Sequence, residues 1–274
     1  MNRIRLLAAL TAIAALCGMT TASVASAQRS TVTMSGSTSV FPLAVKLAGA
    51  FKKTSVGRRV SFRVLQGGSD VGITDASRGR VSIGMSSRDP KSADAGKGVV
   101  FNKIARDAVC VVSNSRNPLP NLSQGQIQDI FSGRIRSWNR VPGARVSGTI
   151  DLIVRTPASG TQDAFQNIFM GQNLRVAGSA TARASNGLQA QSIKSNPNAI
   201  GYASFNFTSG LHSIPYAGNR CTLRNAKSGV YGGARNFFFV TRGAARGATK
   251  AFIRYVRRSS RAKAITATNW VPLR

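Results

Sequence analysis

Short runs of apolar and β-branched residues alternate with longer amphipathic stretches along most of the chain, and this alternation restricts the possible folds more than any other sequence feature. Residues 31–34 are typical of a strand, and residues 42–53 are typical of a helix with a proline in its first turn. Repeated strand-then-helix order predicts an α/β architecture. Further strands are expected at 60–65, 81–85, 108–113, 149–154, 199–203 and 236–241, and further helices at 70–78, 123–131, 161–170 and 248–258.

The first 27 residues have the pattern of a cleavable signal peptide. Two arginines precede an apolar run over 6–17, which is too short to span a bilayer, and residues 25–27 read Ala-Ser-Ala, as before a cleavage site. Cys17 follows Leu16, where a lipoprotein signal has a small residue, so lipidation is not expected. No later segment is long and apolar enough to cross a bilayer. We therefore expect a soluble, periplasmic mature chain that begins at Gln28.

Two cysteines remain in the expected mature chain, Cys110 and Cys221. In an oxidising compartment such a pair is expected to form one disulfide, and the alternative is two buried free thiols. Under either interpretation the pair has a structural role.

Charge limits the chemistry that the chain can perform. It has 38 lysine and arginine residues against 8 acidic residues, all aspartate, for a formal net charge of +30. Catalysis by paired carboxylates and metal cages of several carboxylates therefore have few residues to draw on. His212 is the only histidine, which argues against most zinc sites and against nucleophiles activated by histidine. The composition favours binding of an anion over catalysis, and no cofactor is expected.

Three of the expected strand-to-helix junctions share hydroxyl side chains and glycine. They lie at 35–39, 67–69 and 159–161. Such residues are common helix caps, and Ser159 with Gln162 has the spacing of a capping box. They also present hydroxyls and free backbone amides at helix starts, where anions bind. Because Arg155 and a further hydroxyl cluster at 86–88 accompany the three junctions, together they favour one shared oxyanion site.

Around these junctions the chain resembles the periplasmic phosphate-binding proteins of ABC transporters. The resemblance rests, in order, on the segments SGSTSVFPLA, QGGSDVG, IGMSSRDP, FSGRIRSWNRV, VRTPASGTQDAF, NAIGYASF and NWVPLR. The Arg-x-x-x-Ser-Gly-Thr element and the early Gly-Ser-Thr-Ser turn are its most specific parts. It covers nearly all of the mature chain. It implies a type II periplasmic-binding-protein fold, in which two α/β lobes joined by a two-strand hinge close on the ligand.

The resemblance also implies a set of phosphate-binding residues. These are Ser37, Thr38, Ser39, Ser69, Ser87, Arg88, Arg155, Ser159, Gly160 and Thr161. Arg155 is the strongest candidate because its planar guanidinium can donate two parallel hydrogen bonds to an oxyanion. Some family members have an aspartate where Ser87 stands, and that carboxylate accepts the proton of hydrogen phosphate while it repels sulfate. Asp70 and Asp163 are the nearest substitutes by motif position.

We therefore expect a non-enzymatic monomer that binds inorganic phosphate and presents it to an ABC permease. The first lobe is expected to comprise 28–105 with 241–274, and the second 106–240. Two other hypotheses remain open: a polyanion-binding or adhesive surface protein that uses the positive charge, and a phosphatase-like enzyme that uses the same oxyanion site. The positive charge has two further interpretations: it steers phosphate to the cleft, or it keeps the surface soluble without a partner.

Overall fold

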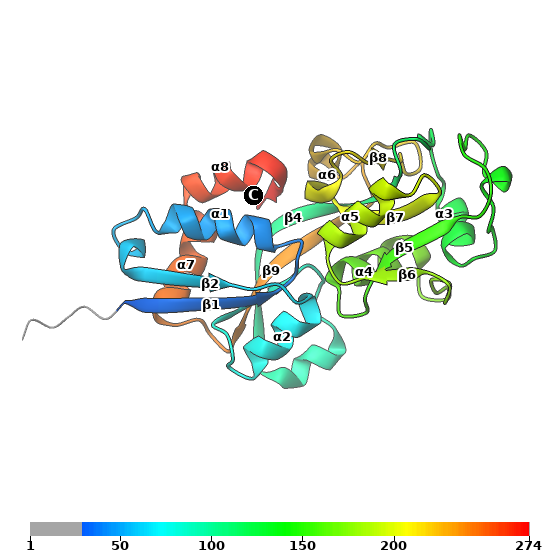
Figure 1. Ribbon diagram of the computed structural model, residues 1–274. Helices are drawn as coiled ribbons and strands as arrows, with labels where there is room; N and C mark the ends of the chain where they lie inside the picture. The colour runs from blue at the N-terminus through cyan, green and yellow to red at the C-terminus, as the bar shows by residue number, and fades with distance from the viewer. Residues whose placement is uncertain (1–28, 274) are drawn as a thin grey trace, which may run out of the picture.

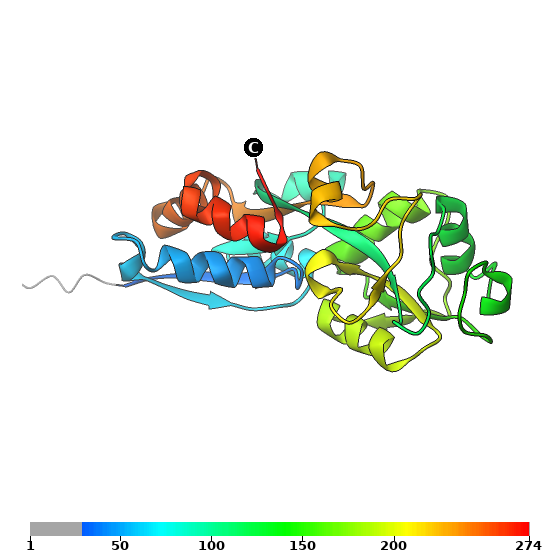
Figure 2. The ribbon, with the colours of Figure 1, turned by 90° about the horizontal axis from the view of Figure 1, so that it is seen from above.

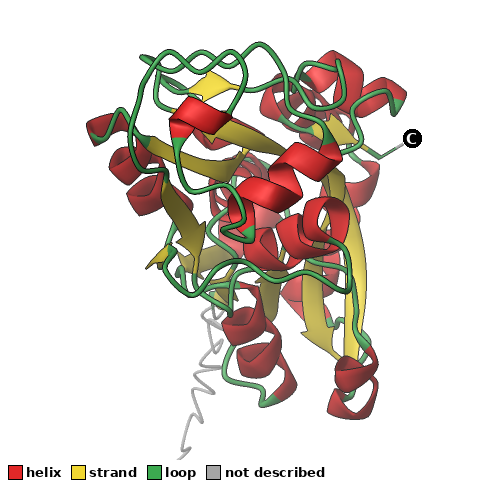
Figure 3. Ribbon diagram, turned by 90° about the vertical axis from the view of Figure 1, so that its right-hand side faces the viewer, coloured by secondary structure: helices red, strands yellow, loops and turns green. Residues whose placement is uncertain are grey.

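The computed structural model describes residues 29–273. The expected signal peptide, residues 1–27, lies outside the described residues. Within 29–273 the chain has the mixed α/β fold that the alternating pattern predicts, with helices flanking the strands (Figure 3). None of the helices in this range combines the length and the apolar character needed to cross a bilayer.

The described residues form ten strands and eight α-helices. The strands are β1 (Ser30–Gly36), β2 (Val60–Val64), β3 (Ile83–Ser86), β4 (Val99–Ser113), β5 (Asp151–Arg155), β6 (Thr181–Arg183), β7 (Ala199–Ser204), β8 (His212–Ser213), β9 (Ala234–Arg242) and β10 (Val271–Pro272). The helices are α1 (Phe41–Phe51), α2 (Ser69–Ser77), α3 (Gln124–Phe131), α4 (Gly160–Phe165), α5 (Asn186–Ser195), α6 (Leu223–Ser228), α7 (Gly247–Arg258) and α8 (Ser260–Asn269).

One long strand, β4, connects two sheets. The strand order is β2-β1-β3-β9-β4-β7-β5-β6, and β8 and β10 also pair with β4. Residues Val99 to Ala108 of β4 pair with β9, whereas Val109 to Ser113 pair with β7. The chain therefore passes from a first sheet to a second sheet within β4, and it returns to the first sheet at the start of β9. The expected division into lobes at 105/106 and 240/241 stays a prediction.

Helices cover both faces of the first sheet. Alternation along β9 puts Phe237 and Phe239 in one core with α1, α7 and α8, whereas Phe238 and Val240 pack against α2 on the opposite face. Figures 1 and 2 show α1 beside α8 on one side of this sheet, and Figure 1 shows α2 on the other. Strands that are covered by helices on both faces have near-continuous apolar runs in their sequence, as β9 does.

The second sheet is built in the same way around its own core. Val109 and Val111 of β4 pack with α3 and α4, whereas Cys110 and Val112 point to the opposite face, toward α5 and α6. Cys110 is bonded to Cys221, which stands just before α6, with their Cα atoms 5.7 Å apart. The expected disulfide is thus confirmed, and the alternative of two free thiols is not.

Each helix or strand expected from the sequence has a counterpart in the structure, with ends that differ by a few residues. The largest difference is β4, which begins at Val99 instead of at residue 108. The structure also contains α5, α6 and α8 and the short strands β6, β8 and β10, which the sequence pattern did not predict. α5 matters for the site because its first residue, Asn186, reaches the hydroxyl cluster described below.

Candidate functional site

The turns after β1 and β5 meet where the two sheets face each other (Figure 1). The hydroxyl of Ser39, after β1, lies 2.9 Å from that of Thr161, after β5. At α2, the backbone amide of Asp70 donates to the carbonyl of Ala158, at 3.1 Å. Because these contacts join residues of different sheets, the predicted junctions share one cleft.

Two glycines allow the chain to approach this cleft closely. Gly36 ends β1 with a φ of 126°, and a Cβ there would collide with the carbonyl of Met85 in β3. Gly68 precedes α2 with a φ of 98°, and its Cβ would lie 2.8 Å from the carbonyl oxygen of Ala158. Only glycine adopts these backbone angles without strain, so the two residues bring the turn after β1 and the start of α2 to the cleft.

The predicted hydroxyl residues form a buried cluster. Ser37, Thr38, Ser39, Ser69, Ser87, Ser159 and Thr161 are each at most 4% exposed. Ser37 donates a 2.8 Å hydrogen bond to the hydroxyl of Ser87, and the backbone amide of Ser87 donates to Ser69 at 3.0 Å. The hydroxyls therefore bond to one another, and each can turn to donate to or accept from a ligand.

The start of α4 closes the cluster from the second sheet. Ser159 caps this helix by accepting from the backbone amides of Thr161, at 3.1 Å, and Gln162, at 3.3 Å. Gly160 packs directly on the hydroxyls of the other side: a Cβ here would collide with Ser69 Oγ and lie 2.8 Å from Ser87 Oγ. The absence of a side chain at Gly160 is what permits the observed contact between the two sides.

Arg155, the last residue of β5, places an unpaired donor in the interior. It is 2% exposed. Its Nε donates to the carbonyl of Arg183 at 3.0 Å and its Nη2 to that of Ala184 at 2.8 Å, while Nη1 has no partner within residues 29–273. Burial lowers the pKa of Arg155 to about 10, and the positive charge of Arg235 acts in the same direction. An anion close to this guanidinium would relieve the cost of its burial.

Arg88 is held differently from the other predicted site residues. Its guanidinium donates to Asp70 at 2.6 Å and to Asp94 at 2.7 Å. Burial opposes its charge, but these carboxylates raise the pKa of Arg88. In this structure the side chain is therefore engaged by carboxylates, and its backbone amide is the part that lies close to Gly160.

Sequence reasoning missed Arg235, which bridges the two sides of the cleft. It stands in β9 and is 5% exposed. Its Nη1 donates to Thr161 and its Nη2 to Ser39, both at 2.9 Å. Burial lowers the pKa of Arg235, whereas Asp107 opposes this shift. The only local signal is a charged residue directly before the apolar run 236–241.

Asp107 of β4, also missed, is the carboxylate that the structure brings to this network. Its side chain is fully buried, and Oδ2 accepts hydrogen bonds from Arg235 at 2.8 Å and Ser204 at 2.7 Å. Oδ1 has no partner among the described residues. A lone carboxylate directly before the apolar run 108–113 was its sequence signal. Asn186, a third missed residue, donates to the hydroxyls of Thr38 and Ser39, both at 2.8 Å.

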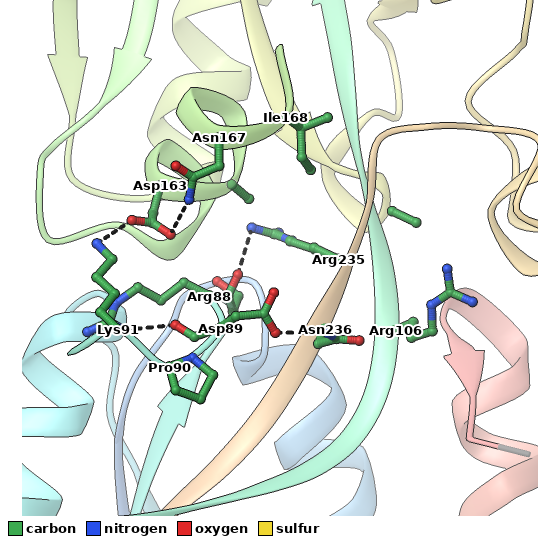
Figure 4. Close-up of a pocket in the computed structure, with 13 residues that line it drawn as sticks. Arg88, Asp89, Pro90, Lys91, Arg106, Asp163, Asn167, Ile168, Arg235 and Asn236 are labelled. Carbon is green, nitrogen blue, oxygen red and sulfur yellow. Dashed lines mark hydrogen bonds and ion pairs between the residues drawn. The ribbon is translucent and has the colours of Figure 1, made fainter. Parts of the chain in front are cut away.

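Asp70 and Asp163, the two carboxylates considered from motif position, lie at the rim. Asp70 accepts from Arg88, and Asp163 forms an ion pair with Lys91 across the cleft. A cavity of 260 Å³ opens beside this ion pair, and Lys91, Asp163 and Arg235 are among the residues that line it. Figure 4 shows Lys91 and Asp163 facing each other and Arg235 pointing toward the cavity from β9.

The described residues offer little for other chemistry. No group of three His, Cys, Asp or Glu side chains within 29–273 is placed to hold a metal ion. His212 stands in β8, where its Nε2 lies 2.7 Å from the carbonyl of Leu119, and it takes no part in the hydroxyl cluster.

Comparisons with known proteins agree with this architecture. The family model of the PBP superfamily domain matches residues 21–260. A Clostridium perfringens structure with bound phosphate, described as a phosphate ABC transporter substrate-binding protein, is 30% identical with a TM-score of 0.83, over 89% of this chain and 100% of that one. Phosphate-binding protein PstS of Bacillus subtilis is 27% identical over 88% of this chain and 80% of its own length.

A shorter match is more similar. Phosphate-binding protein PstS 2 of Streptococcus agalactiae is 39% identical over 108 residues, which are 39% of this chain and 36% of that protein. The matched part thus spans about a third of this curated relative. With a domain model that spans most of the chain and a full-length structural relative at 30% identity, the chain belongs to the PBP superfamily, among the phosphate-binding proteins of ABC transporters.

Proposed function

We propose that this chain binds inorganic phosphate between its two lobes and delivers it to an ABC permease, without chemical turnover. The observation that carries the proposal is a pair of buried atoms that have no partner among residues 29–273: the donor Nη1 of Arg155, at the end of β5, and the acceptor Oδ1 of Asp107, whose other oxygen bonds to Arg235. Buried polar atoms without partners are costly, so such atoms in a cleft call for a ligand that pairs with both.

Hydrogen phosphate has the hydrogen-bonding groups that this site requires. Its oxygens accept from Arg155, Arg235 and the surrounding hydroxyls, and its P–OH proton can be donated to Asp107. Sulfate offers only acceptors at neutral pH, and it would face the Asp107 carboxylate without a proton to share. Asp107 thereby takes the part that the family resemblance assigns to an aspartate at the position of Ser87.

The contacts across the cleft support a closing movement. Hydrogen bonds between Ser39 and Thr161 and between Asn186 and Thr38 join the two sides at the hydroxyl cluster, and the Lys91–Asp163 pair joins them at the rim. The chain passes from the first sheet to the second within β4 and returns to the first sheet at β9. We therefore assign β4 and β9 the role of hinge. Closure buries the anion, and the closed shape is what the permease would recognise.

The remaining expectations follow from the same proposal. Relatives that serve ABC transporters act beside a membrane transporter, so we place this chain outside the cytoplasm, as a monomer exported by the 1–27 signal. A phosphatase-like activity needs a base to activate a nucleophile, and the buried hydroxyls contact other hydroxyls, Arg235 and Asn186 instead of a histidine.

Calorimetry with phosphate, sulfate and molybdate on the mature chain tests the proposal. Phosphate is expected to bind tightly and sulfate at least about a hundredfold more weakly, with binding abolished in Arg155→Ala, because removal of a charged buried donor leaves the anion unpaired. Arg140→Ala, an exposed arginine of the same lobe, is the matched control and should bind like the native chain. Equal affinity for phosphate and sulfate, or release of phosphate from a phosphate ester, would refute the proposal.

A further inference from the structure

All eight acidic residues of the chain lie between positions 70 and 163. The segments that build α1, α7 and α8 fall outside this interval, so this layer of the first lobe has no carboxylate side chain of its own. In the cleft Arg88 and Arg235 pair with aspartates, whereas the charged side chains of this layer are all cations. The function proposed above leaves these cations unexplained.

Twelve exposed cations lie on this layer. They are Lys46, Lys52, Lys53, Arg58, Arg59, Arg246, Lys250, Arg254, Arg257, Arg258, Arg261 and Lys263, and we call them the basic end. None of them takes part in the ion pairs found among residues 29–273. Figure 1 shows α1 running away from the second sheet, so that Lys52 and Lys53 follow its outer end. The basic end therefore extends to the end of α1 that lies away from the second sheet.

Helix α7 shows how the charges are arranged. Phe252, Ile253 and Val256 are buried in the core of the first sheet. Lys250, Arg254, Arg257 and Arg258 fall at intervals of three and four residues, so they share the outer face of the helix. Because the face formed by Phe252, Ile253 and Val256 is already packed, α7 presents a basic outer surface.

An apolar groove lies among these cations. It has a volume of 340 Å³ and is lined by Phe51, Val56, Ala251 and Tyr255 together with Thr54, Ser259, Arg254 and Arg258. Val56, in this lining, is 53% exposed. A soluble polyanion such as polyphosphate has no apolar group that could fill this groove. A lipid offers both an anionic headgroup for the arginines and hydrocarbon for the groove.

We propose that the basic end docks on an anionic lipid surface. The attraction is electrostatic and peripheral, since clustered lysine and arginine residues bind acidic headgroups within a Debye length of the surface. Docking through this face leaves the cleft and the second lobe pointing away from the lipid. The phosphate receptor is thereby held beside its membrane while the cleft stays open to the ligand.

Co-sedimentation of the mature chain with vesicles tests the proposal. Vesicles of equal parts phosphatidylglycerol and phosphatidylcholine are compared with vesicles of phosphatidylcholine alone, at about 50 mM and about 300 mM NaCl. We expect binding to the anionic vesicles only, and at least a tenfold weaker partition at the higher salt concentration. No binding to anionic vesicles at low salt overturns the proposal.

Two variants of equal net charge locate the contact. Arg254→Gln/Arg257→Gln/Arg258→Gln/Arg261→Gln removes four charges from the basic end, and Arg116→Gln/Arg140→Gln/Arg145→Gln/Arg224→Gln removes four exposed charges elsewhere. The first variant is expected to lose about tenfold or more in partition and the second less than about threefold. Equal losses would mean that the overall field, not this face, attracts lipid.

A soluble partner gives a different result. If long-chain polyphosphate or RNA binds the basic end more tightly than the anionic vesicles do, the lipid proposal is wrong. Phosphate calorimetry on both quadruple variants serves as the check on folding and should match the native chain. The lipid proposal is independent of the proposed function, because loss of phosphate binding and loss of vesicle binding are separate measurements.

Discussion

Arginine is used in opposite ways in the cleft and at the basic end. In the cleft, Arg155 and Arg235 are at most 5% exposed, and their donors are directed at carbonyls, hydroxyls and Asp107. At the basic end the arginines are exposed, and none of them pairs with a carboxylate of the described part of the chain. A buried cation must have each donor satisfied and therefore selects a ligand by geometry, whereas an exposed cation attracts any anion and is screened by salt.

This contrast can be tested most directly at Asp107. Asp107→Asn removes the proposed acceptor for the P–OH proton, so phosphate affinity is expected to fall by about a hundredfold, while sulfate affinity changes by less than about tenfold. Calorimetry with both anions measures the two values. Asp129→Asn makes the same charge change on an exposed part of the second lobe and should leave both unchanged. Equal losses for the two anions would show that Asp107 acts only by holding Arg235.

Gly160 tests whether the two sides must meet. Gly160→Ala places a Cβ against Ser69 and Ser87, and the cleft can accommodate it only by opening slightly. Phosphate affinity is expected to fall by about tenfold because overpacking of this kind typically costs about 1–3 kcal/mol. Gly178→Ala is the control, since nothing lies within 4 Å of the Cβ it would introduce. Vesicle binding should be the same in both variants, and a phosphate affinity equal to the native one would contradict the packing argument.

Phosphate should stabilise the folded chain by binding in the cleft, and NaCl should not reproduce this effect. Burial lowers the pKa of Arg155, which means that the charged form is costly in the cleft. A bound anion would offset this cost and so stabilise the folded chain. Phosphate at about 100 times its dissociation constant should add about 2.7 kcal/mol, which is a rise in Tm of about 5–10 °C for a chain of this size. Scanning calorimetry measures the shift. An equal rise on adding NaCl of the same ionic strength, or a full rise in Arg155→Ala, would argue against specific binding.

Asp94 is a buried carboxylate that pairs with Arg88 and Lys97, in contrast to the exposed cations of the basic end. Burial alone would raise the pKa of Asp94, but hydrogen bonds from Arg88, the Lys91 amide and Lys97 hold it far below its ordinary value of 3.8. Its stabilising effect is therefore fully present above about pH 3.8 and is lost as the pH falls further.

Asp94→Asn should accordingly lower the free energy of unfolding by about 1–3 kcal/mol at pH 7. The difference from the native chain should shrink below about pH 3.8, as protonation removes the same charge from the native protein. Urea denaturation at several pH values measures both curves. A difference that stays constant down to about pH 2 would show that the charge of Asp94 contributes nothing.

The fold was predictable wherever an element carried its own pattern. Pro42 and the buried positions Leu43, Leu47 and Phe51 follow helical spacing, so α1 could be recognised without any tertiary information. α8 could not, because its buried residues are only Ala262 and Thr266 and its sequence shows no apolar stripe. Its packing against α1 and α7 determines that it is a helix.

In the candidate site, too, the residues with a local sequence pattern could be predicted and the others could not. The hydroxyl and glycine residues of the turns were identifiable because each junction has a local signature at the start of a helix. Arg235 and Asp107 lie 128 residues apart in the chain and have no motif of their own. Their pairing becomes visible only when β4 and β9 lie side by side.

The sequence by itself determined the alternation of strands and helices, the cysteine pair, the three polar junctions and the excess of positive charge, because each depends on residues close together in the chain or on composition. Tertiary structure alone decided which cations are buried with a carboxylate and which remain exposed without one. The physical reason is that burial and pairing are set by strand register and packing between segments more than a hundred residues apart, and no local pattern encodes them.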